Sequence, residues 1–374
     1  MDVVELASSL IAYKTEIPPG DEEECAKFLH DYIVDSRLGA EAEVDSFGRG
    51  RANLTLRIGP PEPGLLLSGH IDVVPAGDPG AWSYDPFRAR EKEGRLYGRG
   101  AADMKGGLAA ALKAIETIRG RRLRRGLIFV ATAGEEVGFE GLKRLIKTGQ
   151  LKRGLAKFGV LAEPTDLRPV RAHKGLATFR ITFHGKGGHA SDPGLGINAI
   201  ESCAKFVREL ATWNARMKRA SDPDLGSTLA TPTVVRGGTK SNVIPGSCEL
   251  IVDTRWVPRH STAFVEEQMA DIADSLAAKD KKFSASVEML YDAPSLATPA
   301  VHPVVRLAES LSGAASEVAP YGTEAALYST KGIPSVVLGP GSVNQAHTVD
   351  EYVEVKQLRR AESIYAKMIS SVCA

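Results

Sequence analysis

The segment LLLSGHIDVVPAG (residues 65–77) places an imidazole and a carboxylate directly after an apolar run. The run Leu65–Leu67 predicts a buried strand, because a short apolar stretch that ends at a glycine is typical of the interior of a sheet. His70 and Asp72 follow Gly69, and residues two apart in an extended segment point the same way. A strand that ends in this pair indicates a site at the end of the strand.

Around this segment, helical and strand patterns alternate through the first half of the chain. Residues 2–13, 21–36 and 105–119 have helical periodicity, and apolar strand candidates lie at 51–58, 64–69, 126–133 and 158–162. Helices interleaved with continuously apolar strands are typical of a sheet that is covered on both faces. The sequence therefore predicts an α/β domain.

The pattern changes near residue 174. The run LATFRITFHG (176–185) alternates apolar and polar residues, as expected of a sheet with one face in water. The predicted elements that follow are a helix at 197–213, strands at 228–236 and 247–255, a helix at 261–278 and a strand at 283–291. This βαββαβ order is ferredoxin-like and predicts an inserted α+β domain at 174–291. Residues 1–173 and 292–374, which end in an amphipathic helix at 355–372, form the other, discontinuous domain.

Composition excludes several classes of protein. The net charge of +1 over 374 residues gives no field that would favour nucleic acid or an anionic membrane. No apolar segment reaches the roughly 18 residues that span a bilayer, and the N-terminus lacks the features of a signal peptide. The four cysteines are widely spaced, as expected of free thiols in a reducing cytoplasm. The basic run at 119–125 is interpreted as a solvated turn.

Five short segments place carboxylates or imidazoles beside apolar strand candidates: GHID (69–72), GRGAADMKGG (98–107), TAGEEVG (132–138), LAEP (161–164) and QAHTVDEY (345–352). Each alone is weak, because a single histidine at a strand end is usually structural and a Glu-Glu pair is usually a solvated face. Together they lie in the loops where open α/β sheets place their sites. Nitrogen and carboxylate ligands without thiolates suit Zn²⁺, or less often Co²⁺ or Mn²⁺.

The carboxylates are too numerous for one zinc ion, which suggests two metal ions that share a bridging carboxylate. Glu135 and Glu136 are adjacent, so both cannot easily point at one metal. One would ligate a metal, and the other would face a water molecule. Two metals and a free glutamate are suited to hydrolysis of an amide bond.

The chain resembles the family of dinuclear zinc amidohydrolases, which includes acetylornithine deacetylase, succinyl-diaminopimelate desuccinylase, aminoacylase and the glutamate-releasing carboxypeptidases. The motifs SGHIDVVP, YGRGAADMKGG, ATAGEEVG, AEPT, GKGGHAS, SNVIPG and QAHTVDEY occur in the order of that family. The resemblance covers essentially the whole chain. It implies a zinc-peptidase-like mixed-sheet catalytic domain flanked by helices, with an inserted dimerisation or lid domain.

The resemblance also implies roles for individual residues. His70 and Glu163 would hold one zinc ion, Glu136 and His347 the other, and Asp103 would bridge both. The peptide bond after the bridging aspartate is often cis in this family. Glu135 would be the general base, and the Asp72 carboxylate would accept a hydrogen bond from the second N–H of the His70 ring.

In the inserted domain, His189 lies in the glycine-rich segment HGKGGHAS. By resemblance it would reach across a homodimer interface and stabilise the developing oxyanion. Asn242 and Arg255 match positions that contact the substrate, and a guanidinium can bind a carboxylate through two parallel N–H groups. A surface ion pair between Arg255 and Asp253 is the alternative interpretation.

The segment YGTEAALY (321–328) resembles the acetylornithine deacetylase branch. Thr323 and Glu324 are therefore candidate substrate-binding residues, with Glu324 recognising the amino end of a basic N-acyl amino acid. N-acetylornithine, or a related compound of arginine or lysine biosynthesis, is the expected small-molecule substrate. A desuccinylase and a broader aminoacylase or dipeptidase are alternatives. An inactive metal-binding relative is disfavoured, because Glu135 and all five ligand positions are filled.

Overall fold

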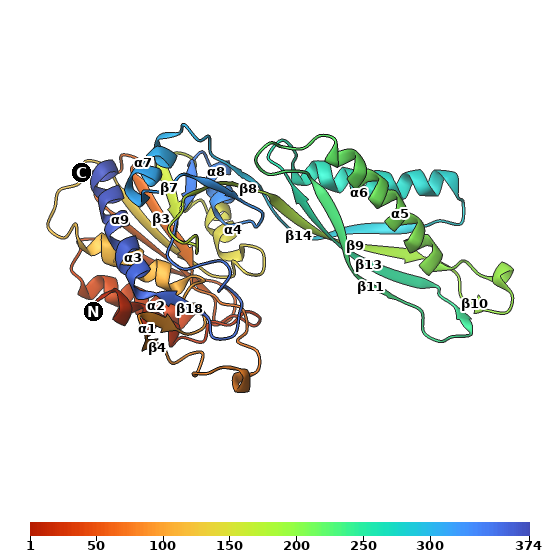
Figure 1. The fold of residues 1–374 in the computed structure, drawn as a ribbon, viewed down its shortest axis with the longest axis horizontal. Coiled ribbons are helices and arrows are strands. Elements are labelled where there is room, and N and C mark those ends of the chain that lie inside the picture. Colours follow the sequence, from red (N-terminus) through yellow and green to blue (C-terminus); the bar gives the residue numbers. More distant parts are fainter. The chain divides into compact units, whose positions relative to one another are not determined.

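The computed structural model describes residues 1–374, which form two compact units. Unit 1 consists of Met1–Ala172, Ala297–Glu317 and Thr323–Ala374, and unit 2 consists of His173–Leu296 and Val318–Gly322 (Figure 1). The chain therefore leaves unit 1 twice, once for the long segment 173–296 and once for the short segment 318–322.

A mixed sheet of nine strands forms the centre of unit 1. The strands follow the order β1-β2-β6-β3-β7-β17-β8-β15, and β16 pairs with β8. Their bounds are β1 Glu41–Ser46, β2 Ala52–Ile58, β3 Leu65–His70, β6 Leu127–Thr132, β7 Phe158–Leu161, β8 Val170–His173, β15 Leu296–Ala297, β16 Glu317–Ala319 and β17 Ser335–Val337. Every residue of β3 is buried, and β3 runs parallel to both β6 and β7. The predicted α/β mixed-sheet class is confirmed.

Helices cover this sheet (Figure 1). They are α1 Val3–Ile11, α2 Glu23–Asp35, α3 Lys105–Glu116, α4 Glu140–Lys147, α7 Pro303–Ser312, α8 Ala325–Thr330 and α9 Val355–Cys373. Helix α3 packs against α1, α9 and β3, and its residues from Lys105 to Leu112 are all buried. A helix that is apolar all round belongs in the interior of a domain, and α3 lies there.

A small three-stranded sheet lies beside the main one. Its strands β4 (Arg90–Lys92), β5 (Arg95–Tyr97) and β18 (Tyr352–Glu354) have the order β18-β5-β4. The antiparallel register places Tyr352 opposite Tyr97. This pairing brings the loop that follows β5 next to the segment that precedes β18, although the two are far apart in the sequence.

Unit 2 contains a four-stranded antiparallel sheet with the order β11-β13-β9-β14. Its elements are β9 Gly175–His184, α5 Ala199–Lys218, β11 Leu229–Gly237, β13 Ser247–Trp256, α6 Thr262–Lys279 and β14 Ala285–Ala293. Phe179, Ile181 and Phe183 alternate along β9 and are fully buried in a core that also contains Phe206 and Trp213 of α5. The chain order and the strand order are those of a ferredoxin-like βαββαβ fold.

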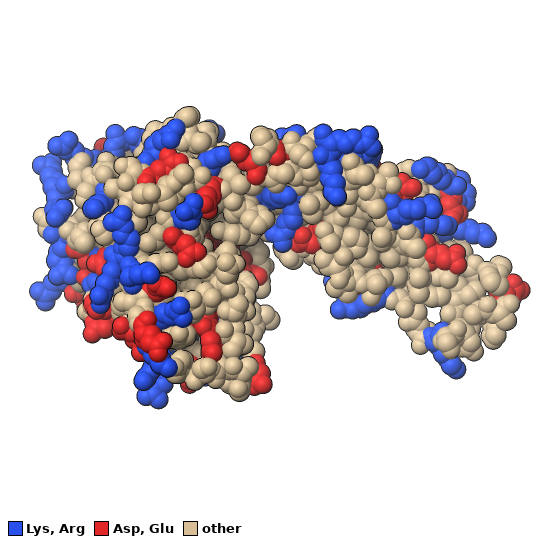
Figure 2. Space-filling model, in the orientation of Figure 1, with Lys and Arg blue, Asp and Glu red and all other residues tan.

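The surface contains both signs of charge. Figure 2 shows Lys and Arg interspersed with Asp and Glu on the visible face of each unit. The basic run at 119–125 is exposed apart from Leu123, in agreement with the predicted solvated turn. All four cysteines are buried free thiols. None of the helices combines the length and the apolar composition that crossing a bilayer requires.

Candidate metal centre

The ends of β3, β6 and β7 place the predicted ligands at one edge of the sheet. His70 is the last residue of β3 and lies opposite Thr132, the last residue of β6. Ser68 of β3 lies opposite Leu161, so β7 ends two residues before Glu163 at the same edge. The carboxyl ends of parallel strands therefore bring separate motifs together.

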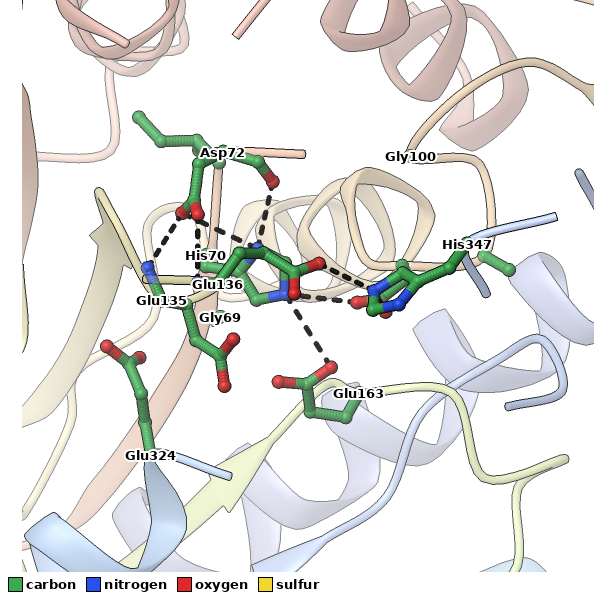
Figure 3. Close-up of polar contacts among 12 residues, drawn as sticks. Gly69, His70, Asp72, Gly100, Glu135, Glu136, Glu163, Glu324 and His347 are labelled. Atoms are coloured by element: carbon green, nitrogen blue, oxygen red, sulfur yellow. Dashed lines mark hydrogen bonds and ion pairs between the residues drawn. The ribbon is translucent and has the colours of Figure 1, made fainter. Parts of the chain in front are cut away.

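The first group of possible ligands contains His70, Asp103 and Glu163, with one donor atom from each lying within 4.8 Å of the others. The Nε2 atom of His70 is 3.0 Å from Asp103 Oδ1 and 3.8 Å from Glu163 Oε2 (Figure 3). His70 and Glu163 are buried, so these side chains face one another inside the protein rather than solvent.

The second group contains Asp103, Glu136 and His347 within the same 4.8 Å limit. His347 Nε2 lies 2.8 Å from Glu136 Oε1 and 3.4 Å from Asp103 Oδ2. Asp103 thus presents Oδ1 to the first group and Oδ2 to the second, which is the arrangement of a bridging carboxylate. The Asp103-Met104 peptide bond is cis, as predicted.

The pKa shifts of the carboxyl and imidazole groups in this site indicate a place suited to divalent cations. Burial raises the pKa of Glu163 to about 7, and nearby Asp103 adds to the increase. Burial also raises the pKa of Glu135 well above its usual value, against the opposing effect of His70. Hydrogen bonds to Asp103 and Glu136 raise the pKa of His347 to about 10. Crowded carboxylates and imidazoles without thiolates suit divalent cations that prefer nitrogen and oxygen ligands.

Asp72 contacts both His70 and the loop that contains the two adjacent glutamates. Its backbone carbonyl accepts a hydrogen bond from His70 Nδ1 at 2.9 Å, whereas its carboxylate Oδ1 is 3.6 Å from that nitrogen. The carboxylate accepts the backbone N–H groups of Glu135 and Glu136, each at 3.1 Å. The expected contact through the Asp72 carboxylate is thus made by the backbone, and the carboxylate fixes the loop after β6.

Glu135 and Glu324 extend toward the same space beside His70 (Figure 3). Glu324 immediately precedes α8 and is 1% exposed. Its Oε2 is 2.8 Å from the Thr132 hydroxyl, whereas its buried Oε1 has no hydrogen-bond partner. Burial raises the pKa of Glu324 to about 8. The adjacent Thr323 is also buried.

Two motif glycines allow the ligand-bearing segments to approach one another. A Cβ atom on Gly107 of α3 would collide with the carbonyl oxygen of Ala162, the neighbour of Glu163. A Cβ atom on Gly69 would collide with the Met104 side chain, next to Asp103. Gly107 requires glycine because α3 packs directly against the backbone that follows β7, whereas at Gly69 the end of the Met104 side chain would have to move.

Unit 2 brings two of its predicted functional residues together. The short strands β10 (Gly188–His189) and β12 (Val243–Ile244) pair, with His189 opposite Val243. The carbonyl oxygen of Asn242 accepts the N–H of Ala190 at 3.0 Å, so Asn242 lies next to the His189 segment. His189 is exposed and bonds to Ser191 Oγ at 2.6 Å.

Arg255 lies on β13 of unit 2 and forms the ion pair that was the alternative interpretation. Its Nε and Nη2 atoms donate to the two carboxylate oxygens of Asp253 at 2.8 and 3.2 Å. The carboxylate-binding role of Arg255 stays a prediction. Arg99 and Glu351 are both buried and lie within the motifs YGRGAADMKGG and QAHTVDEY, but the residue pattern alone predicts no role for either.

A mixed sheet whose strand ends gather two three-residue ligand groups around a shared aspartate is the architecture of a metal-dependent hydrolase. Residues 66–371 match the model of peptidase family M20/M25/M40, and the chain belongs to this family. The fold is also that of three solved structures. A tripeptidase from Staphylococcus aureus Mu50 is 24% identical, with a TM-score of 0.77 and coverage of 98% of this chain and 97% of that chain.

The metallo-carboxypeptidase Sso-CP2 from Sulfolobus solfataricus is 20% identical, with a TM-score of 0.80 and 99% of each chain covered. The YXEP protein of Bacillus subtilis, described as a dinuclear metal binding peptidase, is 18% identical, with a TM-score of 0.72 and coverage of 98% of this chain and 96% of that chain. At these identities the likeness establishes the fold.

Proposed function

We propose that this protein hydrolyses the amide bond of an N-acyl amino acid at a centre of two zinc ions. The observation that carries the proposal is the geometry of Asp103, whose two carboxylate oxygens serve separate groups of ligands. His70 and Glu163 would complete one metal site, and Glu136 and His347 the other. Co²⁺ or Mn²⁺ would suit the same ligands.

Two divalent cations would lower the pKa of a water molecule that they share and would polarise the scissile carbonyl group. Glu135 ligates neither cation in this assignment, and its side chain extends into the space beside His70 (Figure 3). It would accept the proton of the attacking water and pass it to the leaving amine. The Asp72 carboxylate would support this step by fixing the backbone of Glu135 and Glu136. His189 would donate a hydrogen bond to the carbonyl oxygen as negative charge develops on it.

N-acetylornithine is the proposed substrate, with ornithine and acetate as products. The segment around Thr323 and Glu324 supports this choice, because the unpartnered Oε1 of Glu324 would accept a hydrogen bond from a cationic amino group. Arg255 and Asn242 would contact the carboxylate end of the substrate. A peptide substrate is the second candidate, since the solved structures with this fold include a tripeptidase and a metallo-carboxypeptidase.

A substrate panel tests the proposal. The metal-depleted protein is reloaded with zinc or with cobalt, and kcat/KM is measured for acetylated, succinylated and glutamyl amino acids and for dipeptides. We expect two zinc ions per chain, loss of hydrolysis on chelation and the highest kcat/KM for acetylornithine. Full zinc loading without hydrolysis of any of these compounds would mean that the protein only binds metal. A preference for succinylated compounds or for dipeptides would replace the proposed substrate.

We also propose that the protein is a cytoplasmic homodimer that pairs through unit 2. Strand β11 is an edge strand whose residues 231–237 are all exposed, including Val234 and Val235. An exposed edge strand with apolar side chains is suited to association. Val235→Lys should convert a dimer to a monomer in light scattering, whereas Arg236→Lys on the same strand should not. A wild-type monomer that is fully active would contradict the dimer.

A further inference from the structure

The carboxylate of Glu351 is enclosed by the loop that presents Asp103. Its Oε1 accepts the backbone N–H groups of Ala102 at 2.8 Å and of Asp103 at 3.0 Å. Its Oε2 accepts the N–H of Gly100 at 3.1 Å and Arg99 Nη1 at 2.6 Å. Both side chains of the Arg99–Glu351 pair are almost fully buried, at 3% and 1% exposure. One carboxylate thus accepts three backbone N–H groups of a ligand-bearing loop.

Arg99 extends this contact to two other segments. Its Nη1 atom also donates to the carbonyl oxygen of Thr348 at 3.2 Å, beside His347. Its Nη2 atom donates to the carbonyl oxygen of Pro75 at 3.4 Å, in the segment that follows His70. The guanidinium also lies 5.1 Å from the ring of Trp82. Arg99 therefore contacts the backbone of two segments that present histidines.

The fold gives Glu351 this place through the pairing of β5 with β18. Glu351 immediately precedes β18, and its backbone carbonyl accepts the N–H of Gly98, which immediately follows β5. His347 lies four residues before Glu351 and has a left-handed backbone with φ of 62°. A non-glycine residue in that region persists only where its surroundings hold it.

We propose that Glu351 and Arg99 are positioning residues that set the distance between Asp103 and His347 and thereby establish the second metal site. This inference rests on the proposed dinuclear function. Glu351 fixes the backbone of Asp103 directly, and Arg99 ties Glu351 to the His347 segment. His70 and Glu163 are held mainly by the ends of β3 and β7, and Arg99 reaches the segment after His70 only through the carbonyl oxygen of Pro75. Loss of the buried pair should therefore weaken the second metal ion more than the first.

Zinc titration of the metal-free full-length protein against a competing chelator tests this inference. Glu351→Gln keeps the shape of the side chain but places an NH₂ group against backbone N–H donors. Because Arg99 retains the remaining oxygen, the Ala102 and Asp103 donors lose their acceptor. We expect the affinity for the second zinc ion to fall about 10- to 100-fold, the range for partners that orient metal ligands. The first zinc ion should be affected less.

Glu354→Gln is the matched control. It is the same chemical change on the same segment, at a side chain that is 30% exposed and paired with Lys356. We expect this variant to bind both zinc ions as the wild type does. Glu351→Asp, which restores a carboxylate one methylene shorter, should recover part of the lost affinity. If Glu351→Gln only destabilised the protein in general, restoring a carboxylate would not specifically recover the affinity for the second zinc ion.

The outcomes separate this inference from the proposed function. Wild-type protein that binds two zinc ions and hydrolyses its substrate, together with Glu351→Gln protein of unchanged zinc affinities, overturns the positioning role alone. Wild-type protein that binds fewer than two zinc ions overturns the proposed dinuclear centre. If Glu351→Gln does not fold, the same zinc titration is carried out on Arg99→Lys. This variant keeps the positive charge but loses the separate hydrogen bonds that the two Nη atoms of Arg99 donate. Unchanged affinities in that variant would likewise overturn the inference.

Discussion

The interiors of the two units differ in the charges that they contain. Unit 1 buries charged side chains around its candidate metal centre, among them Asp72, Glu163, Glu324 and Glu351. In unit 2, the buried polar residues are His173, Thr178, Ser202, Thr228 and Thr254, with no Asp, Glu, Lys or Arg among them. The candidate functional residues His189 and Asn242 of unit 2 are exposed.

This difference indicates that the two units hold their candidate functional side chains in two different ways, one in a buried charged network and the other at the surface. A buried charge is costly unless a partner or a metal compensates it, so the groups of unit 1 are tied into one network. Substitutions there should change metal binding, stability and activity together. Exposed groups on a separately packed core can be removed without cost to folding. Substitutions of those groups in unit 2 should change activity alone.

The general base should give the largest effect. Glu135→Ala is expected to lower kcat by 10²- to 10⁴-fold, because a positioned base typically contributes that factor. Zinc content should stay at two per chain, since Glu135 is assigned to neither metal. The measurements are steady-state kinetics and metal analysis of the same preparation. Activity within a few fold of wild type would show that another residue is the base.

His189 should give the next largest effect and is the sharpest test of the difference between the units. His189→Ala is expected to lower kcat about 10²- to 10³-fold, the range for loss of one oxyanion donor. Its zinc content and melting temperature should match the wild type, because the side chain is exposed.

His184→Ala is the matched control for His189. His184 is exposed on the solvent face of β9, where it bonds to Ser286. We expect wild-type kinetics for this variant. Equal losses in the two variants, or a lowered melting temperature for His189→Ala, would remove the distinction drawn between the units.

Most of the candidate metal ligands lie in short motifs at strand ends, which is why the sequence could single them out. His70 ends a strand, and Glu135, Glu136 and Glu163 follow strands, all of them recognisable by their apolar residues. The alternating residues of β9 likewise predict which face of unit 2 is buried. Local patterns suffice in these cases, since the parallel register of β3, β6 and β7 brings the strand ends together.

Contacts that depend on distant pairing could not be predicted. Strands β5 and β18 have three residues each, too few for a periodic signal, and they pair across most of the chain. Without that pairing nothing in the sequence places Glu351 against the Asp103 loop. The sequence also cannot distinguish which oxygen of Asp72 meets His70, because the backbone carbonyl and the carboxylate belong to the same residue. Such details depend on loop geometry.

Glu324 tests whether the buried charges of unit 1 also select the substrate. Glu324→Gln should raise KM for acetylornithine roughly tenfold, because a hydrogen bond to a charged group contributes about 1.5–3 kcal/mol. An ammonium group beside Oε1 would favour the ionised carboxylate and lower its raised pKa. KM for acetylmethionine, which lacks the cationic side chain, is the control and should change little. Equal increases for both substrates would exclude recognition of the amino group.

The smallest expected effect concerns Glu22, a fully buried carboxyl group of unit 1 that is paired with Arg51 at 2.7 Å. Burial raises its pKa to about 7, although Arg51 opposes the shift, and one of its oxygens has no hydrogen-bond partner. The folded protein therefore binds this proton more tightly than the unfolded chain, whose value is 4.5. The Glu22 contribution to stability is greatest below pH 4.5 and declines as the pH rises toward 7.

Glu22→Gln cannot ionise and should lack this decline. Melting temperatures of metal-free wild-type and variant protein, measured between pH 5 and pH 8, isolate the effect from zinc dissociation. As the pH rises, the melting temperature of the variant should increase relative to that of the wild type by a few degrees. This size follows because 1 kcal/mol corresponds to roughly 2–4 °C in a domain of about this size. Parallel curves would show that Arg51 compensates the Glu22 carboxylate fully. In that case the interior of unit 1 would tolerate a paired charge away from the metal centre at no net cost.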